Sequence, residues 1–312
     1  MKIPDSPPAA IRAERIPLVY IHSASHSGST LLTLRLARHP QVGTVGELSG
    51  TPMRARPGYR CSCGEELAAC GFWQEVSAAM ARRGFAYRAT TDQTDIANAP
   101  TAYARRLLRP LHRGPLLERV RDAGLALSSA ARAHIGQHQR IKAALVESVV
   151  ECNGSPVLVD SSKSGVQLKY HLRNPRFDVR VIWLVRDGRG VARSLMRNQR
   201  MRMRQAAYEW LRSNEEAGVI VERLASGAWT RVRYEEFCAD PEGTLAALWR
   251  FMGVAPGPPQ EGVEQHVLGH VSRLSAEREI RADEKWRTEL SAADLRGFEA
   301  IAGAMNRRLG YR

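Results

Sequence analysis

Four short runs of apolar residues stand out along the chain, and each ends where a polar turn begins. They cover residues 16–21, 156–159, 179–185 and 229–234 and are rich in β-branched and aromatic side chains. The first three are too short and too uniformly apolar for amphipathic helices. Strands that are covered on both faces lose the alternation of half-exposed strands, so we expect these three to be central strands of a parallel sheet.

Helical patterns separate these runs, at residues 29–38, 101–108, 126–151, 164–173, 190–225, 241–252 and 291–309. The strand–helix–strand order predicts a three-layer α/β/α fold with right-handed crossovers, whose ligands bind beyond the carboxyl ends of the strands. We expect one domain over 16–312, in which 74–150 form a helical insertion or lid. Residues 1–15 hold three prolines and no secretory signal, which indicates a disordered lead-in and a cytoplasmic protein.

Composition narrows the class of protein further. The 312 residues are 44% hydrophobic and 25% charged, which is typical of a globular chain, and no apolar run is long enough to span a membrane. There are 46 basic and 32 acidic residues, a net charge of +14, and only five of the basic residues are lysines. Such an arginine-rich surface suits anionic partners. Nucleic acid is the weaker alternative, because no helix-turn-helix, zinc-finger or RNA-binding pattern accompanies the charge.

A turn of small residues lies between the first apolar run and the helix after it. Residues 23–30 read Ser-Ala-Ser-His-Ser-Gly-Ser-Thr, and Gly28 lets the backbone approach a ligand closely. A strand–turn–helix junction of this kind presents unpaired N–H groups to a phosphate, although it can also be a simple helix cap. Ser29 stands where a Walker A loop needs lysine, so this is not the loop of an ordinary NTPase.

The segment from His26 resembles the 5′-phosphosulfate loop of sulfotransferases that use 3′-phosphoadenosine 5′-phosphosulfate (PAPS). The family pattern is Lys or Arg followed by Ser/Thr, Gly, Ser/Thr and Ser/Thr, and here it is matched by the residues His26, Ser27, Gly28, Ser29 and Thr30. The resemblance implies that these residues bind the donor and that His26 also serves catalysis. Because histidine replaces a residue of fixed charge, we expect donor binding to depend on pH near neutrality.

A second segment matches the other end of the same nucleotide. In this family the Arg that closes a later strand, and a Ser eight residues on, hold the 3′-phosphate; the matching residues are Arg186 and Ser194. Guanidinium and hydroxyl groups both suit a phosphate. An ion pair of Arg186 with Asp187 is the alternative that needs no ligand. Tyr234 and Lys285 lie in further segments that resemble the family, and they carry over as nucleotide contacts.

Glu47 is the candidate general base. It lies 21 residues beyond His26, the spacing that the tyrosylprotein sulfotransferases show between their loop and their catalytic Glu. Lys163 follows the second apolar run, so it opens onto the same crevice and is expected to neutralise the transferring sulfuryl group, with Ser162 as a further donor. The alternative is that Lys163 and Ser162 are solvated turn residues.

The resemblance, closest to the tyrosylprotein and carbohydrate branch, implies a bacterial PAPS-dependent sulfotransferase that acts on a hydroxyl acceptor, releases adenosine 3′,5′-bisphosphate and requires no metal. A P-loop-like kinase that uses ATP is the alternative enzyme. Neither the acceptor nor the oligomeric state follows from the sequence. Cys61, Cys63 and Cys70 form a Cys-x-Cys-x₆-Cys segment that is either a loop shaping the acceptor site, with or without thiol chemistry, or three ligands of a metal whose fourth ligand comes from elsewhere.

Overall fold

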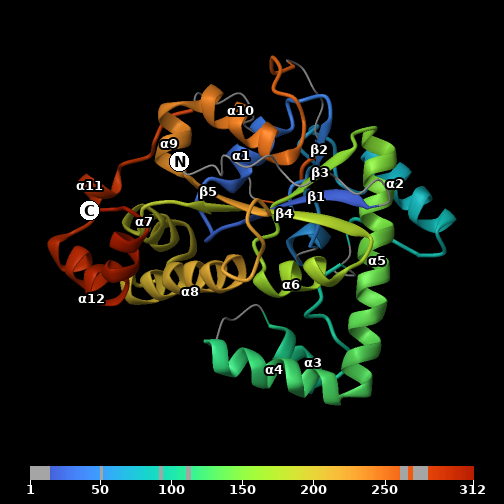
Figure 1. The fold of residues 1–312 in the computed structure, drawn as a ribbon, viewed down its shortest axis with the longest axis horizontal. Helices are drawn as coiled ribbons and strands as arrows, with labels where there is room; N and C mark the ends of the chain where they lie inside the picture. Colours follow the sequence, from blue (N-terminus) through green and yellow to red (C-terminus); the bar gives the residue numbers. More distant parts are fainter. Residues whose placement is uncertain (1–14, 50–51, 91–93, 110–113, 261–265, 270–279) are drawn as a thin grey trace.

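A parallel sheet of five strands forms the centre of the computed structural model, which describes residues 15–49, 52–90, 94–109, 114–260, 266–269 and 280–312 (Figure 1). The strands are β1 (Ile16–His22), β2 (Val42–Thr44), β3 (Val157–Asp160), β4 (Phe177–Val185) and β5 (Trp229–Arg233). Their order is β2-β3-β1-β4-β5. The three runs expected to be central strands are β1, β3 and β4, and they occupy the middle of the sheet.

Helices cover both faces of this sheet, which gives the expected three layers (Figure 1). Val19 of β1 and Ile182 of β4 pack on the face covered by α1 (Ser29–Leu36) and α10 (Pro241–Met252). Tyr20 and Val181, one residue away in each strand, pack on the opposite face. Three helices cover that opposite face, α6 (Gly165–Arg173), α7 (Gly188–Gln199) and α8 (Met203–Val221). Buried residues on both faces explain why the strands read as unbroken apolar runs.

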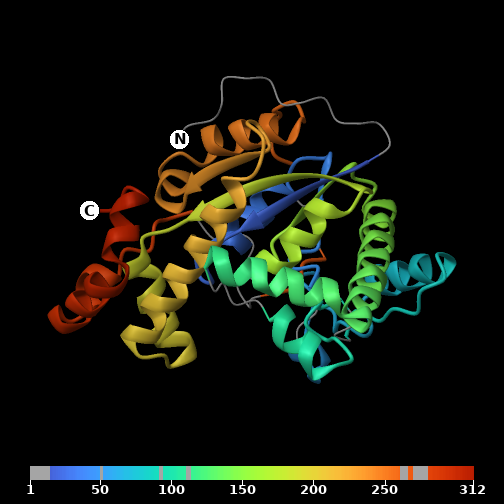
Figure 2. The ribbon, with the colours of Figure 1, turned by 60° about the horizontal axis from the view of Figure 1, so that its bottom comes forward.

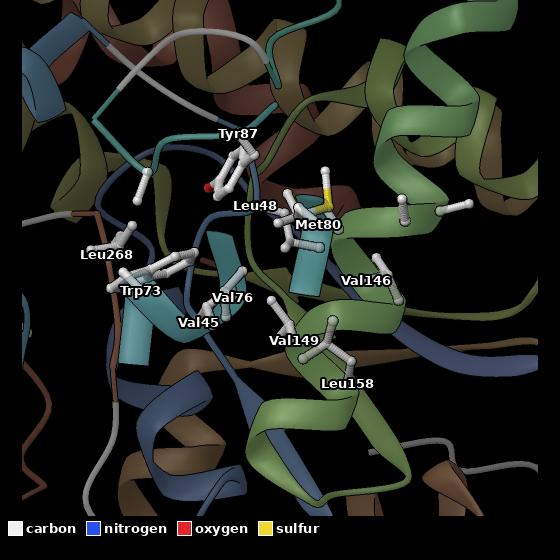
Figure 3. Packing of buried hydrophobic residues seen from close by; sticks show 14 of the residues in the cluster. Val45, Leu48, Trp73, Val76, Met80, Tyr87, Val146, Val149, Leu158 and Leu268 are labelled. Atoms are coloured by element: carbon white, nitrogen blue, oxygen red, sulfur yellow. The ribbon is translucent and has the colours of Figure 1, made fainter. Parts of the chain in front are cut away.

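The segment 74–150 is helical in its described part, as expected, and divides into two packing units. The first comprises α2 (Gly71–Arg82) and α5 (Ser129–Asn153), which extend the main core (Figure 3). There Trp73 and Met80 of α2 meet Val149 of α5 and Leu48 of the loop after β2.

The second unit has a small core of its own. It comprises α3 (Ala102–Leu108) and α4 (Pro115–Leu127), and its buried residues include Leu108, Leu125 and, from α6, Tyr170. In Figure 2, which brings the lower side of Figure 1 forward, α4 crosses in front of the sheet.

Several elements differ from the sequence expectation. Strand β2 was not foreseen, because its three residues are too few to show a periodicity. The helix expected over 190–225 is two helices, since Arg200 has a left-handed backbone with φ of 54° and ends α7. Three further elements that were not expected are η1 (Pro52–Ala55), α9 (Tyr234–Ala239) and α11 (Trp286–Glu289). The helix expected over 291–309 is α12 (Ala292–Arg308). Within the described ranges, no helix is both long and apolar enough to cross a bilayer.

The expected lead-in over residues 1–15 lies outside the described residues except for Arg15. The side chain of Arg15 donates a hydrogen bond to the carbonyl of Pro175 at 2.8 Å. The described chain therefore contacts the turn before β4 from its first residue.

Candidate active site

The carboxyl ends of the five strands carry five of the side chains that the sequence singled out. Because the strands are parallel, these ends lie along one edge of the sheet. In the sheet order β2-β3-β1-β4-β5, the residues that follow the strands are Glu47, Lys163, His26, Arg186 and Tyr234. Glu47 and Lys163 therefore lie on one side of the loop after the central strand, and Arg186 and Tyr234 lie on the other.

The loop after β1 leads into a helix whose first N–H groups are capped by no side chain of the described chain. His26 and Gly28 both have left-handed backbones, with φ of 61° and 92°. Ser29 and Thr30 begin α1. The hydroxyl of Ser27 is buried and has no hydrogen-bond partner among the described residues. A helix N-terminus with an unpaired hydroxyl beside it is suited to an anion, which would accept bonds from both.

Gly28 is in close contact with the ring of Tyr234, the residue that follows β5. A Cβ atom at Gly28 would lie 2.6 Å from Cδ2 of that ring, so no larger residue fits. The guanidinium of Arg186 lies over the same ring, 4.6 Å from its centroid. Burial raises the pKa of Tyr234 to about 12, so its hydroxyl remains a donor at neutral pH. Loop, ring and guanidinium therefore pack as one unit.

Arg186 joins this loop to the C-terminal part of the chain. Its guanidinium donates to the carbonyl of His26 at 2.9 Å and to the carbonyl of Asp283 at 2.8 Å. The Asp283 carboxylate lies 3.5 Å from Arg186 and 3.4 Å from Arg193. Asp187, the alternative partner in the sequence, pairs with Arg189 at 2.6 Å. The ligand-free explanation of Arg186 by an ion pair with its neighbour is therefore wrong.

Ser194 and Lys285 are related to Arg186 through neighbouring residues. The hydroxyl of Ser194 donates to the carbonyl of Gly190 at 2.9 Å. Gly190 itself borders Arg186, because a Cβ atom there would lie 3.3 Å from Nε of that arginine. Lys285 precedes α11 with an exposed side chain, and its N–H donates to the Asp283 carboxylate at 3.3 Å. The structure thus brings Ser194 close to Arg186, and it connects Lys285 to them through Asp283.

Glu47 and Lys163 form an ion pair at the other end of the edge. Nζ of Lys163 lies 2.5 Å from Oε1 of Glu47, and the two side chains are 17% and 19% exposed. The other carboxylate oxygen, Oε2, accepts no hydrogen bond from the described residues. The backbone of Glu47 is fixed on both sides, since its N–H donates to Leu268 at 3.3 Å and its carbonyl accepts from the buried Arg54. A partly exposed carboxylate on a fixed backbone is suited to accept a proton from a bound hydroxyl.

Two buried groups that the sequence did not indicate, Asp160 and His171, stabilise the loops that carry this ion pair. Asp160 ends β3 and accepts hydrogen bonds from the N–H of Leu48 at 3.1 Å and from the hydroxyl of Ser162. His171 lies 3.5 Å from it. Burial raises the pKa of Asp160, but the bond and charge of His171 and the charge of Lys142 outweigh it and hold the pKa below the ordinary value. The loops that carry Glu47 and Lys163 are therefore anchored on one buried carboxylate.

Lys142 is a third group that stabilises these loops. It is buried in α5 and donates to the carbonyl of Leu48 at 2.9 Å. Burial lowers its pKa to about 7, although the nearby Asp160 carboxylate opposes the shift. The sequence signal was present, because Lys142 is one of only five lysines and adjoins the apolar run 143–146.

The hydroxyl of Ser162 makes its hydrogen bonds within the loops after β2 and β3. It donates to Asp160 and accepts from the N–H of Ser49 at 3.0 Å. We expected this hydroxyl to donate to the transferring group, and its proton is instead used within the fold. Lys163 remains as the cation at this end of the edge.

The parallel sheet between two helical layers, with the candidate site at the carboxyl ends of its strands, defines a three-layer α/β/α protein. In the comparison with protein families, residues 17–256, more than half of the chain, match the model of the Sulfotransferase family. The chain therefore belongs to the Sulfotransferase family and is a transferase. No curated protein sequence gives a significant match.

Two solved structures share the fold. The sulfotransferase domain of the Synechococcus PCC 7002 olefin synthase is 20% identical, with a TM-score of 0.52, and the match covers 94% of this chain and 96% of that one. The sulfotransferase domain from the curacin biosynthetic pathway is also 20% identical, with a TM-score of 0.53 and coverage of 96% and 99%. At this identity the likeness establishes the three-layer fold.

Proposed function

We propose that this sulfotransferase moves a sulfuryl group from PAPS to a hydroxyl group of an acceptor. The observation that carries the proposal is the order of the strand ends. An anion-binding loop follows the central strand, arginines lie on one side of it, and a carboxylate–ammonium pair lies on the other. A donor with two phosphate positions needs two anion sites, and its reaction needs a base beside one of them.

The residues on the edge fit such a donor. The backbone of 26–30 and the unpaired hydroxyl of Ser27 would hold the 5′-phosphosulfate. Arg186 and Ser194 would hold the 3′-phosphate, with Tyr234 and Lys285 as further nucleotide contacts. PAPS supplies the activated sulfuryl group, and the chain supplies the base and the charge that stabilises the transfer.

Glu47 is the proposed base, with Oε2 as the atom that accepts the proton of the acceptor hydroxyl. As the acceptor oxygen bonds to sulfur, the bond from sulfur to the phosphate oxygen breaks and negative charge passes to the phosphate. Lys163 would stabilise that charge, which requires its ammonium to move from Oε1 of Glu47 toward the transferring group. The ion pair thus holds both groups ready before the acceptor binds.

His26 connects the loop with the arginine side of the edge. Its carbonyl accepts from Arg186, and its Nε2 lies 3.3 Å from the side-chain nitrogen of Gln199. When protonated, the imidazole would add a positive charge beside the phosphosulfate. This position fits the role of a pH-dependent donor ligand.

Calorimetry on the full chain tests the donor. Adenosine 3′,5′-bisphosphate should bind saturably and more tightly than 5′-AMP, which lacks the 3′-phosphate, and ATP with Mg²⁺ should not be turned over. A panel of hydroxyl acceptors with PAPS, followed by mass spectrometry, then tests the transfer. Equal affinity for the two adenosine nucleotides would reject the 3′-phosphate site, and phosphate transfer from ATP would identify a kinase instead.

A further inference from the structure

Four side chains that the proposed reaction does not use converge beside the sheet. Cys61 and Cys63 lie in the turn that follows η1, Cys70 precedes the first residue of α2, and His266 comes from a segment almost 200 residues later. Cys61 and Cys70 are buried and the other two are half-buried. Three thiols and an imidazole in this arrangement match the donor types of a zinc site.

The spacing of the donor atoms is that of a shared central ion. Sγ of Cys63 and Sγ of Cys70 are 3.6 Å apart, and Nδ1 of His266 lies 3.8 Å from Sγ of Cys61 and 3.6 Å from Sγ of Cys70. All four donor atoms lie within 4.8 Å of one another. A tetrahedral zinc ion with ordinary bond lengths would place sulfurs about 3.8 Å apart and sulfur about 3.5 Å from nitrogen.

The surrounding chain fixes the donors in place. The ring of His266 stacks on Phe72 with centroids 4.3 Å apart and an angle of 4° between the planes. The N–H of Cys61 donates to the carbonyl of Glu65 at 2.9 Å, and the N–H of Gly64 donates back to Cys61 at 3.1 Å, which closes the turn around Cys63. A disulfide between Cys63 and Cys70 would use two of these groups and leave the convergence of Cys61 and His266 without a reason.

We propose that Cys61, Cys63, Cys70 and His266 bind one Zn²⁺ ion that serves structure. Four protein ligands complete a tetrahedron and leave no position for water or substrate, which is the mark of a structural site. The ion would hold the His266–Gly269 segment against the turn. That segment carries the backbone partner of Glu47, because the N–H of Leu268 donates to Val45 at 2.8 Å and its carbonyl accepts from Glu47.

The zinc site thus determines where the base stands without taking part in the transfer. Its existence depends on neither the proposed donor nor the proposed acceptor, so its test is independent of sulfation. Elemental analysis of the full chain, purified under reducing conditions without chelator, should find about one zinc per chain. Cys63→Ser and His266→Ala should each lose most of that zinc, and the matched control Cys152→Ser should keep it.

A second measurement on the wild type covers the case in which the variants fail to fold. Chain stripped of metal should bind one equivalent of Co²⁺ with the visible absorption of tetrahedral thiolate coordination, and Zn²⁺ should displace it. The proposal is overturned if reduced wild-type chain holds no zinc and takes up neither ion stoichiometrically. It is also overturned if the four residues can be replaced without loss of metal, or if iron is the ion found.

Discussion

At the scale of single residues, the ion pair between Glu47 and Lys163 fixes the side chain of the proposed base. The carboxylate offers one oxygen to the ammonium, and its backbone is held by Leu268 and Arg54. A base has to keep its position while it accepts a proton. The ion pair and the two backbone bonds favour this, because misplacement by about an ångström can cost about a hundredfold in rate.

Replacing Glu47 by Gln removes the proposed base and preserves the shape of the side chain. Glutamine still offers an oxygen to Lys163, so melting temperature and nucleotide affinity should stay close to wild type. Single-turnover sulfation should slow by roughly 10²–10⁴, the usual contribution of a general base. A variant that keeps more than about a third of the wild-type rate would show that another group takes the proton.

Arg186→Ala removes the guanidinium expected on the 3′-phosphate. Calorimetry should show a loss of about 2–4 kcal/mol for adenosine 3′,5′-bisphosphate and a much smaller loss for 5′-AMP. Arg231→Ala is the matched control, because it removes the same charge from an exposed position of β5. Equal losses for the two nucleotides would mean that Arg186 acts only by holding the loop through His26.

At the scale of elements, some features follow from local pattern and others from distant pairing. The runs that became β1, β3 and β4 were predictable because burial on both faces leaves a uniform apolar sequence. Strand β2 was not, since Val42–Thr44 is a strand only through its pairing with Val157–Val159, more than one hundred residues away. No glycine or proline beside Arg200 indicates the break between α7 and α8 in the sequence.

The same distinction holds within the candidate site. Loops 26–30 and 186–194 were recognisable because each is a short continuous sequence. The buried pair of Asp160 and His171 was missed because it acts through contacts that the fold alone creates. Lys142 stands out as a lysine beside an apolar run, but its partner, the carbonyl of Leu48, lies far away in the sequence. His266, which faces the three cysteines, is separated from them by about 200 residues and carries no local signal.

The segment before α11 places a carboxylate where a phosphate is proposed to bind. Asp283 contacts both Arg186 and Arg193 and is 34% exposed. Asp283→Asn should therefore tighten binding of adenosine 3′,5′-bisphosphate about two- to fivefold, as expected for a partly exposed charge. The gain should shrink at high salt, which screens this repulsion. Weaker binding by the variant would mean that Asp283 orients the arginines for the nucleotide.

At the scale of the whole molecule, one buried carboxyl makes stability depend on pH. Burial raises the pKa of Glu216 in α8 to about 7, from an ordinary value of 4.5. The groups that face it from other elements are His22, Glu118, Arg121 and Lys169. Because the folded state binds more protons than the unfolded state between these two pH values, the stability that Glu216 contributes below about pH 4.5 is lost as the pH rises through 7.

Glu216→Gln removes this titration. The free energy of unfolding of the variant, relative to wild type, should rise by about 2–3 kcal/mol between pH 5 and pH 8. Urea denaturation at several pH values measures it. The control is Glu222→Gln at the end of the same helix, whose carboxylate is 63% exposed and should change little. A constant difference between wild type and Glu216→Gln at all pH values would contradict the buried titration.

The backbone hydrogen bonds of Leu268 with Val45 and Glu47 also affect the order in which the enzyme folds. All five strands are complete by Arg233, so a nascent chain can form the sheet and the loop after β1 before residues 266–269 are made. Leu268, which binds the backbone of Glu47, is made more than two hundred residues after Glu47, and contacts of such long sequence separation form slowly. During translation, the loop proposed to bind the 5′-phosphosulfate can therefore form before the backbone of Glu47 is fixed.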